Sequence, residues 1–292
     1  NMLVLYVFWE LTSILSFLLI GHRITSRHSR SAAMEALVIT AGGGLAMLVG
    51  IIGLGAATGS YSISNLLAHP PQVDALVTTS VVLLLVGAFT KSAQVPFHFW
   101  LPGAMAAPTP VSAYLHAAAM VKAGIYLVAR FAPAFAHLEV WQWAVLLLGG
   151  PTMLVGAYRS LRQVDIKLVL AYGTVSQLGF LVLVVGHGTQ DAARAGLVLL
   201  LAHALFKGSL FLVVGAIDHC TGTRDLRRLS GLSRSMPLLF ATACVSAASM
   251  AGLPPLLGFV SKEGAYTALD PTVHGWATRE GVAFLLSLIH IS

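Results

Sequence analysis

Long apolar stretches are the feature that most restricts how this chain can fold. About eight segments of roughly 20 residues carry few or no charges, and this is the length that an α-helix needs to cross a bilayer. They lie near 2–21, 33–57, 75–95, 110–130, 140–158, 166–187, 193–217 and 236–264. A membrane β-barrel would show short alternating segments instead. The sequence therefore predicts an all-α polytopic membrane protein.

The composition excludes several classes of function. Hydrophobic residues make up 57% of the chain and charged residues only 10%, against about 25% charged in soluble domains. The net charge of +6 is spread over short loops and spans, so no nucleic-acid partner is expected. Cys220 and Cys244 read as free thiols. Because no metal-ligand spacing, phosphate loop or dinucleotide motif is present, we expect no cofactor, no metal site and no covalent catalysis.

Loop charges predict the orientation in the membrane. The loops expected on one side carry 10 basic residues, whereas the opposite side carries only Arg130 and Arg194. The 10 are Arg23, Arg27, Arg30, Arg159, Arg162, Lys167, Arg224, Arg227, Arg228 and Arg234. Cytoplasmic loops are enriched in such residues. The sequence thus indicates a multi-pass protein of a bacterial cell membrane, with its arginine-rich loops in the cytoplasm.

Prolines interrupt two of the predicted spans. Pro96 follows closely on Lys91 in the third, and two adjacent prolines precede Lys262 in the eighth. Proline removes a backbone donor and frees carbonyl groups at membrane depth. Transporters place such breaks at binding sites, often in equivalent helices of inverted repeats. Because segments 87–92 and 258–263 are weakly similar, we predict two discontinuous helices within an inverted-repeat fold.

Ionisable residues lie inside the predicted spans. Four of the five lysines do so, namely Lys91, Lys122, Lys207 and Lys262. Inserting an ammonium costs roughly 2.5–3.5 kcal/mol, so such residues normally face a polar interior and mark an ion or proton path. Glu10 lies in the first span, and Lys91 is its preferred partner. A position of Glu10 near the membrane surface is the alternative.

Two histidines accompany these lysines. His203 and Lys207 are four residues apart and share a helix face. His116 and Lys122 are six apart and point in different directions, although they can line one channel at two depths. Histidine suits proton relay because its pKa lies near neutrality. Each histidine taken singly could instead be a hydrogen-bonded packing residue.

Asp165 and Lys167 begin the sixth span. The pattern favours a charge cluster at the cytoplasmic surface, in which the helix N-terminus stabilises Asp165. A relay role is the less favoured alternative.

Several motifs together resemble one known family. Residues 91–102 and 107–113, followed by His116 and Lys122, resemble the antiporter-like subunits of Mrp-type multisubunit sodium/proton antiporters and of the membrane arm of respiratory complex I. Segments 8–13, 165–172, 203–207 and 258–263 match in the same order. The resemblance extends from about residue 2 to residue 285.

The resemblance implies a mechanism and partners. It implies two inverted five-helix repeats and a chain of buried proton-translocating residues across the membrane midplane. These are Glu10, Lys91, His116, Lys122, His203, Lys207 and Lys262. It also implies other membrane subunits in a hetero-oligomeric complex, with protons and a monovalent cation, foremost Na⁺, as the transported ions.

Three classes of function stay open from the sequence. Residues 215–226 and Lys122 look most like the large A-type subunit of an Mrp antiporter, which is part of a transporter rather than an enzyme. The alternative is the L-type subunit of complex I or of a related membrane-bound hydrogenase, a proton-pumping but non-redox part of an oxidoreductase. The third is a structural scaffold whose lysines pair with acidic groups of neighbouring subunits.

The resemblance also predicts the extent of the domain. Residues 1–285 form a single antiporter-like transmembrane domain, a fragment without the family's first and last helices. Residues 286–292 resemble either a translated adapter sequence or the start of another helix, and both interpretations stay open.

Overall fold

Helices form nearly all of the regular structure. The computed structural model describes residues 1–115 and 119–270. The longer helices are α1 (Met2–Ile20), α2 (Arg27–Thr58), α4 (Ala75–Lys91), α7 (Met120–Phe135), α8 (Glu139–Leu161), α9 (Ile166–Gly186), α10 (Gln190–Thr221), α12 (Pro237–Ala251) and α13 (Leu257–Leu269). The shorter ones are α3 (Ile63–Ala68), α5 (Trp100–Gly103), α6 (Thr109–Ala113) and α11 (Leu232–Ser235), with 3₁₀ turns η1 (Phe97–Phe99), η2 (Ala104–Ala106) and η4 (Leu226–Arg228).

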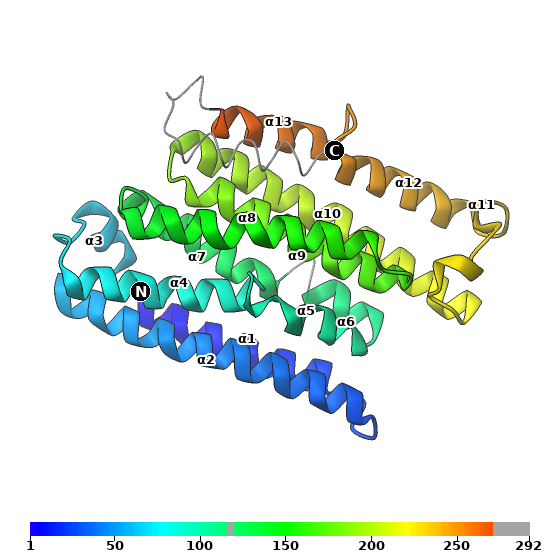
Figure 1. The fold of residues 1–292 in the computed structure, drawn as a ribbon, viewed down its shortest axis with the longest axis horizontal. Helices are drawn as coiled ribbons and strands as arrows, with labels where there is room; N and C mark the ends of the chain where they lie inside the picture. Colours follow the sequence, from blue (N-terminus) through cyan, green and yellow to red (C-terminus); the bar gives the residue numbers. More distant parts are fainter. Residues whose placement is uncertain (116–118, 271–292) are drawn as a thin grey trace.

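The long helices lie side by side in one bundle (Figure 1). Helix α2 packs against both α1 and α4, while α8 packs along α9. Helix α10 contacts α9 on one side and the pair α12 and α13 on the other. Helix α7 lies against α4 and α9. The interior helices α7, α9 and α10 therefore meet near the middle of the bundle.

Five helices in the described part of the chain are long and apolar enough to cross a membrane: α1, α2, α8, α9 and α10. They coincide with five of the ranges predicted from hydropathy. The other three predicted ranges consist of shorter helices, namely α4, the pair α6 and α7, and the pair α12 and α13. The protein is therefore an all-helical membrane protein.

The break predicted near Pro96 is present. Helix α4 ends at Lys91, and Ala93 then takes the left-handed conformation with φ of 50°. The carbonyl groups freed by the break find partners inside the protein. The indole of Trp100 donates to the carbonyl of Thr90 at 3.0 Å. Satisfied carbonyls allow the helix to stop at membrane depth.

The second predicted break separates α12 from α13. Helix α12 ends at Ala251, and Gly252 caps it with φ of 86°. A residue with a Cβ is strained in that region, which explains why glycine stands there. The two prolines follow before α13 begins at Leu257.

The fourth predicted span is also interrupted, which the sequence did not indicate. Helix α6 ends at Ala113, and Tyr114 and Leu115 form a wider π turn. Helix α7 begins only at Met120. His116 lies in 116–118, outside the described residues.

Glycines on α2 allow close contact with its neighbours. A Cβ at Gly43 would overlap Thr90 Oγ1 of α4, and one at Gly44 would overlap Glu10 Oε1 of α1. Gly42, by contrast, faces open space, with nothing within 4 Å of the position of its absent Cβ. Two of these three adjacent glycines thus serve the packing of specific side chains.

Candidate functional site

Helix α1 holds the amine of Lys91. Its Nζ donates to the carbonyl of Trp9 at 2.7 Å and to Ser13 Oγ at 2.7 Å. It also lies 4.8 Å from the centre of the Trp9 ring, within the range of a cation–π interaction. Lys91 is 0% exposed. A fully buried amine is therefore held by neutral acceptors and an aromatic face.

Glu10 lies between these two acceptors in the sequence. It is half-buried and packs against Gly44 of α2. Its Oε1 has no hydrogen-bond partner in the described part of the chain. Glu10 is within electrostatic reach of Lys91, yet no ion pair of 4.0 Å or less joins them among residues 1–115 and 119–270. Lys91, the predicted partner of Glu10, is thus nearby, but its amine is bound to Trp9 and Ser13 instead.

Lys122 joins α7 to α10. Its Nζ donates to the carbonyl of Leu200 at 3.1 Å, and the side chain is 6% exposed. It reaches a cavity of about 470 Å³ that Arg130, Leu197 and Leu200 also line. We name this the Arg130 cavity. Because Arg130 belongs to the sparsely charged side, this cavity lies toward the predicted outer face of the membrane.

His203 and Lys207 share one buried face of α10, as their spacing predicts. His203 is 0% and Lys207 1% exposed. Neither ring nitrogen of His203 has a hydrogen-bond partner in the described structure, and the ring is within electrostatic reach of both Lys122 and Lys207. The Nζ of Lys207 donates to the carbonyl of Leu170 on α9 at 3.3 Å. An unpartnered imidazole therefore lies between two buried amines.

Lys167 is a buried amine, whereas its neighbours in the sequence indicated a position at the surface. The side chain is 1% exposed, and its Nζ donates to the carbonyls of Met105 at 3.0 Å and Ala107 at 2.6 Å. On α9 it lies three residues before Leu170, the residue that accepts from Lys207. The neighbouring charges of Arg162 and Asp165 indicated an interfacial helix start, and no local sequence pattern predicted that this side chain is buried.

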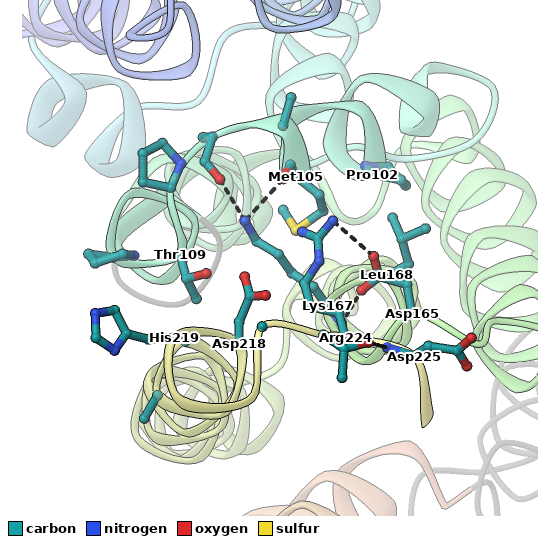
Figure 2. A pocket seen from close by; sticks show the side chains of 18 of the residues that line it. Pro102, Met105, Thr109, Asp165, Lys167, Leu168, Asp218, His219, Arg224 and Asp225 are labelled. Atoms are coloured by element: carbon teal, nitrogen blue, oxygen red, sulfur yellow. Dashed lines mark hydrogen bonds and ion pairs between the residues drawn. The ribbon is translucent and has the colours of Figure 1, made fainter. Parts of the chain in front are cut away.

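A large cavity opens at Lys167 (Figure 2). Its volume is about 1250 Å³, and Asp165, Asp218 and Arg224 help to line it. Figure 2 shows the carboxylate of Asp218 inside this cavity, facing the side chain of Lys167. We name it the Arg224 cavity. Because Arg224 belongs to the arginine-rich loops, it lies toward the predicted cytoplasmic face.

Hydrogen bonds and an ion pair join two segments that line the Arg224 cavity, the start of α9 and the loop after α10. Asp165 caps α9 by accepting from the backbone N–H of Lys167 at 2.8 Å, which confirms its predicted helix-start role. Arg224 reaches Asp165 at 3.3 Å (Figure 2), and an isolated antiparallel bridge joins Asp165 to Asp225. Hydrogen bonds from Arg227 hold the pKa of Asp225 at about 2. The loop after α10 is thereby tied to the start of α9.

Lys262 lies apart from these groups. It is half-buried on α13, and its Nζ donates to the carbonyl of Ala251 across the break at 3.3 Å. In the described part of the chain no hydrogen bond links it to Lys207, although α13 packs against α10.

Four buried ionisable groups lie on three neighbouring helices, and we refer to Lys122, His203, Lys207 and Lys167 as the row. Lys122 donates to the carbonyl of Leu200, three residues before His203 on α10, and Lys207 donates to the carbonyl of Leu170, three residues after Lys167 on α9. In the described part of the chain no hydrogen bond joins Lys207 to Lys167. The Arg130 cavity meets one end and the Arg224 cavity the other. Amines and imidazoles take up and release protons, so the row has the chemistry of a proton relay.

Comparison with known proteins identifies the family. The profile of the family described as "NADH:quinone oxidoreductase/Mrp antiporter, TM" matches residues 1–270. The chain is 53% identical over 265 residues to the probable K(+)/H(+) antiporter A/B subunit of Rhizobium meliloti, covering 90% of this chain and 26% of the relative. It is 50% identical over 288 residues to the A-type subunit of the Na(+)/H(+) antiporter of Bacillus subtilis, covering 94% and 36%.

Solved structures agree with this assignment. The Mrp complex from Dietzia sp. DQ12-45-1b superposes with a TM-score of 0.93 at 44% identity, covering 100% of this chain and 32% of that one. The membrane-bound sulfane sulfur reductase, an archaeal respiratory membrane complex, gives 0.87 at 25% identity, covering 98% and 59%. The chain thus spans about a quarter to a third of the two curated relatives named above. It belongs to the family of transmembrane proteins shared by NADH:quinone oxidoreductase and Mrp antiporters.

Proposed function

We propose that this chain is part of a proton-translocating subunit of an Mrp-type multisubunit cation/proton antiporter, with Na⁺ as the favoured cation. The observation that carries the proposal is the row of Lys122, His203, Lys207 and Lys167 between two cavities. One cavity faces each predicted side of the membrane. Such a row, buried within the protein, gives protons a route that avoids lipid.

The hydrogen-bond partners of the buried amines support proton exchange. In the described structure, the amines of Lys122 and Lys207 each donate to a single backbone carbonyl. An amine held only by neutral acceptors can release its proton without leaving a buried carboxylate unpaired. His203 has unpartnered nitrogens between the two. A buried imidazole in this position can accept a proton from one amine and donate one to the other, directly or through bound water.

Glu10 and Lys91 form a separate site of ionisable groups. We propose that the electric field of their charges changes the proton affinity of the row. Two unit charges about 8 Å apart interact by roughly 2 kcal/mol at an effective dielectric near 20, and such an energy changes a proton equilibrium more than tenfold. Protonation at Lys91 would therefore bias proton occupancy at Lys122 and onward toward Lys207 and Lys262. His116 is proposed for the same path from the family resemblance alone.

The similarity to antiporter subunits favours antiport over redox-driven pumping. Both curated relatives described above are antiporter subunits, at 53% and 50% identity, whereas the respiratory reductase is 25% identical. The proposed partners are accordingly the other membrane subunits of the antiporter. Genes for small antiporter subunits beside the parent gene would support this assignment, and genes for a peripheral redox arm would support the complex I alternative.

The test measures proton and Na⁺ flux in vesicles that carry the intact parent complex. Lys207→Met keeps the apolar volume but removes the amine, and Leu205→Met on the exposed face of α10 is the matched control. We expect Lys207→Met to abolish coupled flux with assembly intact, while the control transports normally. Glu10→Gln and Lys91→Met, alone and together, test the coupled site.

Two results would count against the proposal. Normal flux in Lys207→Met would remove the row from the mechanism. Loss of assembly in Lys207→Met and Lys91→Met, with normal flux per assembled complex, would support the scaffold alternative, in which the lysines only hold subunits together.

A further inference from the structure

The amine of Lys91 is bound by two acceptors of α1, and Glu10 lies between them in the sequence. The carbonyl of Trp9 belongs to the residue before Glu10, and the hydroxyl of Ser13 stands three residues after it. Residues three apart share a helix face. The ammonium therefore meets α1 at the level of the carboxylate, yet it is bound to Ser13 and Trp9.

We propose that Ser13 is a positioning residue that holds the Lys91 ammonium apart from Glu10 and so keeps it available for proton exchange. This inference rests on the proposed function, because it concerns how one of its charged sites is regulated. Ser13 and Glu10 act as two competing acceptors for a single ammonium. Which of them is bound determines whether the charge of Lys91 is paired or free to act on the rest of the path.

The surroundings of Ser13 fit this role. Ser13 is 0% exposed, so bulk solvent does not reach its hydroxyl. Its Oγ accepts from Lys91 at 2.7 Å and is oriented by its own weak bond to the carbonyl of Trp9 at 3.4 Å. The hydroxyl therefore points its lone pair at the amine.

The surroundings of Glu10 leave its carboxylate available as an acceptor for the amine of Lys91. Its Oε1 is buried without a hydrogen-bond partner in the described part of the chain. A buried acceptor without a partner is costly, so the carboxylate gains when an ammonium reaches it. Removing the Ser13 hydroxyl leaves Glu10 as the stronger remaining acceptor. The amine should then move from Ser13 to Glu10.

The experiment uses the intact parent complex and a matched control on the same helix. Ser16 is 2% exposed and donates to the carbonyl of Ser13, and among the described residues it forms no hydrogen bond with Lys91. We expect Ser13→Ala to slow proton flux about tenfold, equivalent to about 1.4 kcal/mol, while Ser16→Ala stays at the wild-type rate. Ser13→Thr keeps the hydroxyl and should restore flux. Ser13→Cys keeps the volume with a weak acceptor, and it serves if the alanine variant does not assemble.

A structural measurement separates positioning from packing. In the parent complex carrying Ser13→Ala, or Ser13→Cys, we expect electron cryomicroscopy to show Lys91 Nζ within about 4 Å of the Glu10 carboxylate, the distance of an ion pair. An amine that stays at the Trp9 carbonyl overturns the inference. So does equal flux in the Ser13 variants and wild type, or an equal loss in Ser16→Ala. Absence of flux in the wild-type complex would instead refute the proposed function.

Discussion

Replacing Gly44 by alanine tests whether the position of the Glu10 carboxylate matters for transport. The added Cβ would overlap Glu10 Oε1 and lie 2.9 Å from its carboxyl carbon. Non-bonded contacts of this kind normally begin near 3.5 Å, so the carboxyl carbon must move by at least about 0.6 Å and the oxygen by more. The side chain is flexible at its far end, and it can turn away without moving α1.

The cost to stability is small, and the cost to function is large. Alanine is more favourable than glycine inside a helix by about 0.5–1 kcal/mol, which offsets part of the displacement. We therefore expect the Gly44→Ala complex to assemble with an apparent Tm near that of wild type. A displacement of about 1 Å in a functional group can reduce a rate about a hundredfold. We expect proton flux in vesicles to fall between about tenfold and a hundredfold on that basis.

Gly42 supplies the matched control two residues away on the same helix. Nothing lies within 4 Å of the position of its Cβ, so Gly42→Ala changes helix propensity alone. Equal flux in the Gly42→Ala and Gly44→Ala complexes, both assembled, would refute the idea that the carboxylate must stay where α2 leaves room for it.

Three further predictions concern stability and are read from thermal unfolding of the purified parent complex. Asp165→Ala removes the cap of α9 together with the pair to Arg224 and should cost at least about 1 kcal/mol. Asp191→Ala removes an exposed pair with Arg194 and an exposed carboxylate in the first turn of α10, and should cost less, about 0.5 kcal/mol; equal effects would contradict the cap. Gly179→Ala places a Cβ 2.6 Å from backbone atoms of α8 and should destabilise by about 1–3 kcal/mol, so an unchanged Tm would show that α8 and α9 separate easily. The hydrogen bonds from Arg227 depress the pKa of Asp225 to about 2. Their contribution to the stability of the folded state is therefore complete above about pH 4, the pKa of an aspartate in the unfolded chain, and is lost as the pH falls toward 2. A Tm difference between wild type and Asp225→Asn that vanishes already at neutral pH would contradict this sign.

The positions of the charged residues were predicted more reliably than their partners. The in-span lysines Lys91, Lys122 and Lys207 are buried, as hydropathy indicates. Their partners follow from helix contacts that no local pattern encodes, such as the carbonyl of Leu200 for Lys122. The position of Lys167 was predicted wrongly. Its charged neighbours indicated the membrane interface, yet its side chain is only 1% exposed.

Some helix breaks were predictable from the sequence and others were not. Proline and glycine carry their conformational limits in the sequence, so the interruptions after Lys91 and Ala251 were predictable. The π turn at Tyr114 and Leu115 was not, because it contains no residue that forbids a regular helix.

The sequence by itself determined that the chain crosses a membrane, which loops carry the positive charge, and which side chains are too costly to place in lipid. These properties depend on composition and spacing along one helix. The tertiary structure alone decided that Lys122, His203, Lys207 and Lys167 are buried on three packed helices, with one cavity at Lys122 and another at Lys167, and that Lys91 is bound to Ser13 rather than to Glu10. The reason is physical: a buried amine takes whichever acceptor packing brings within about 3 Å, and that acceptor lies on another helix.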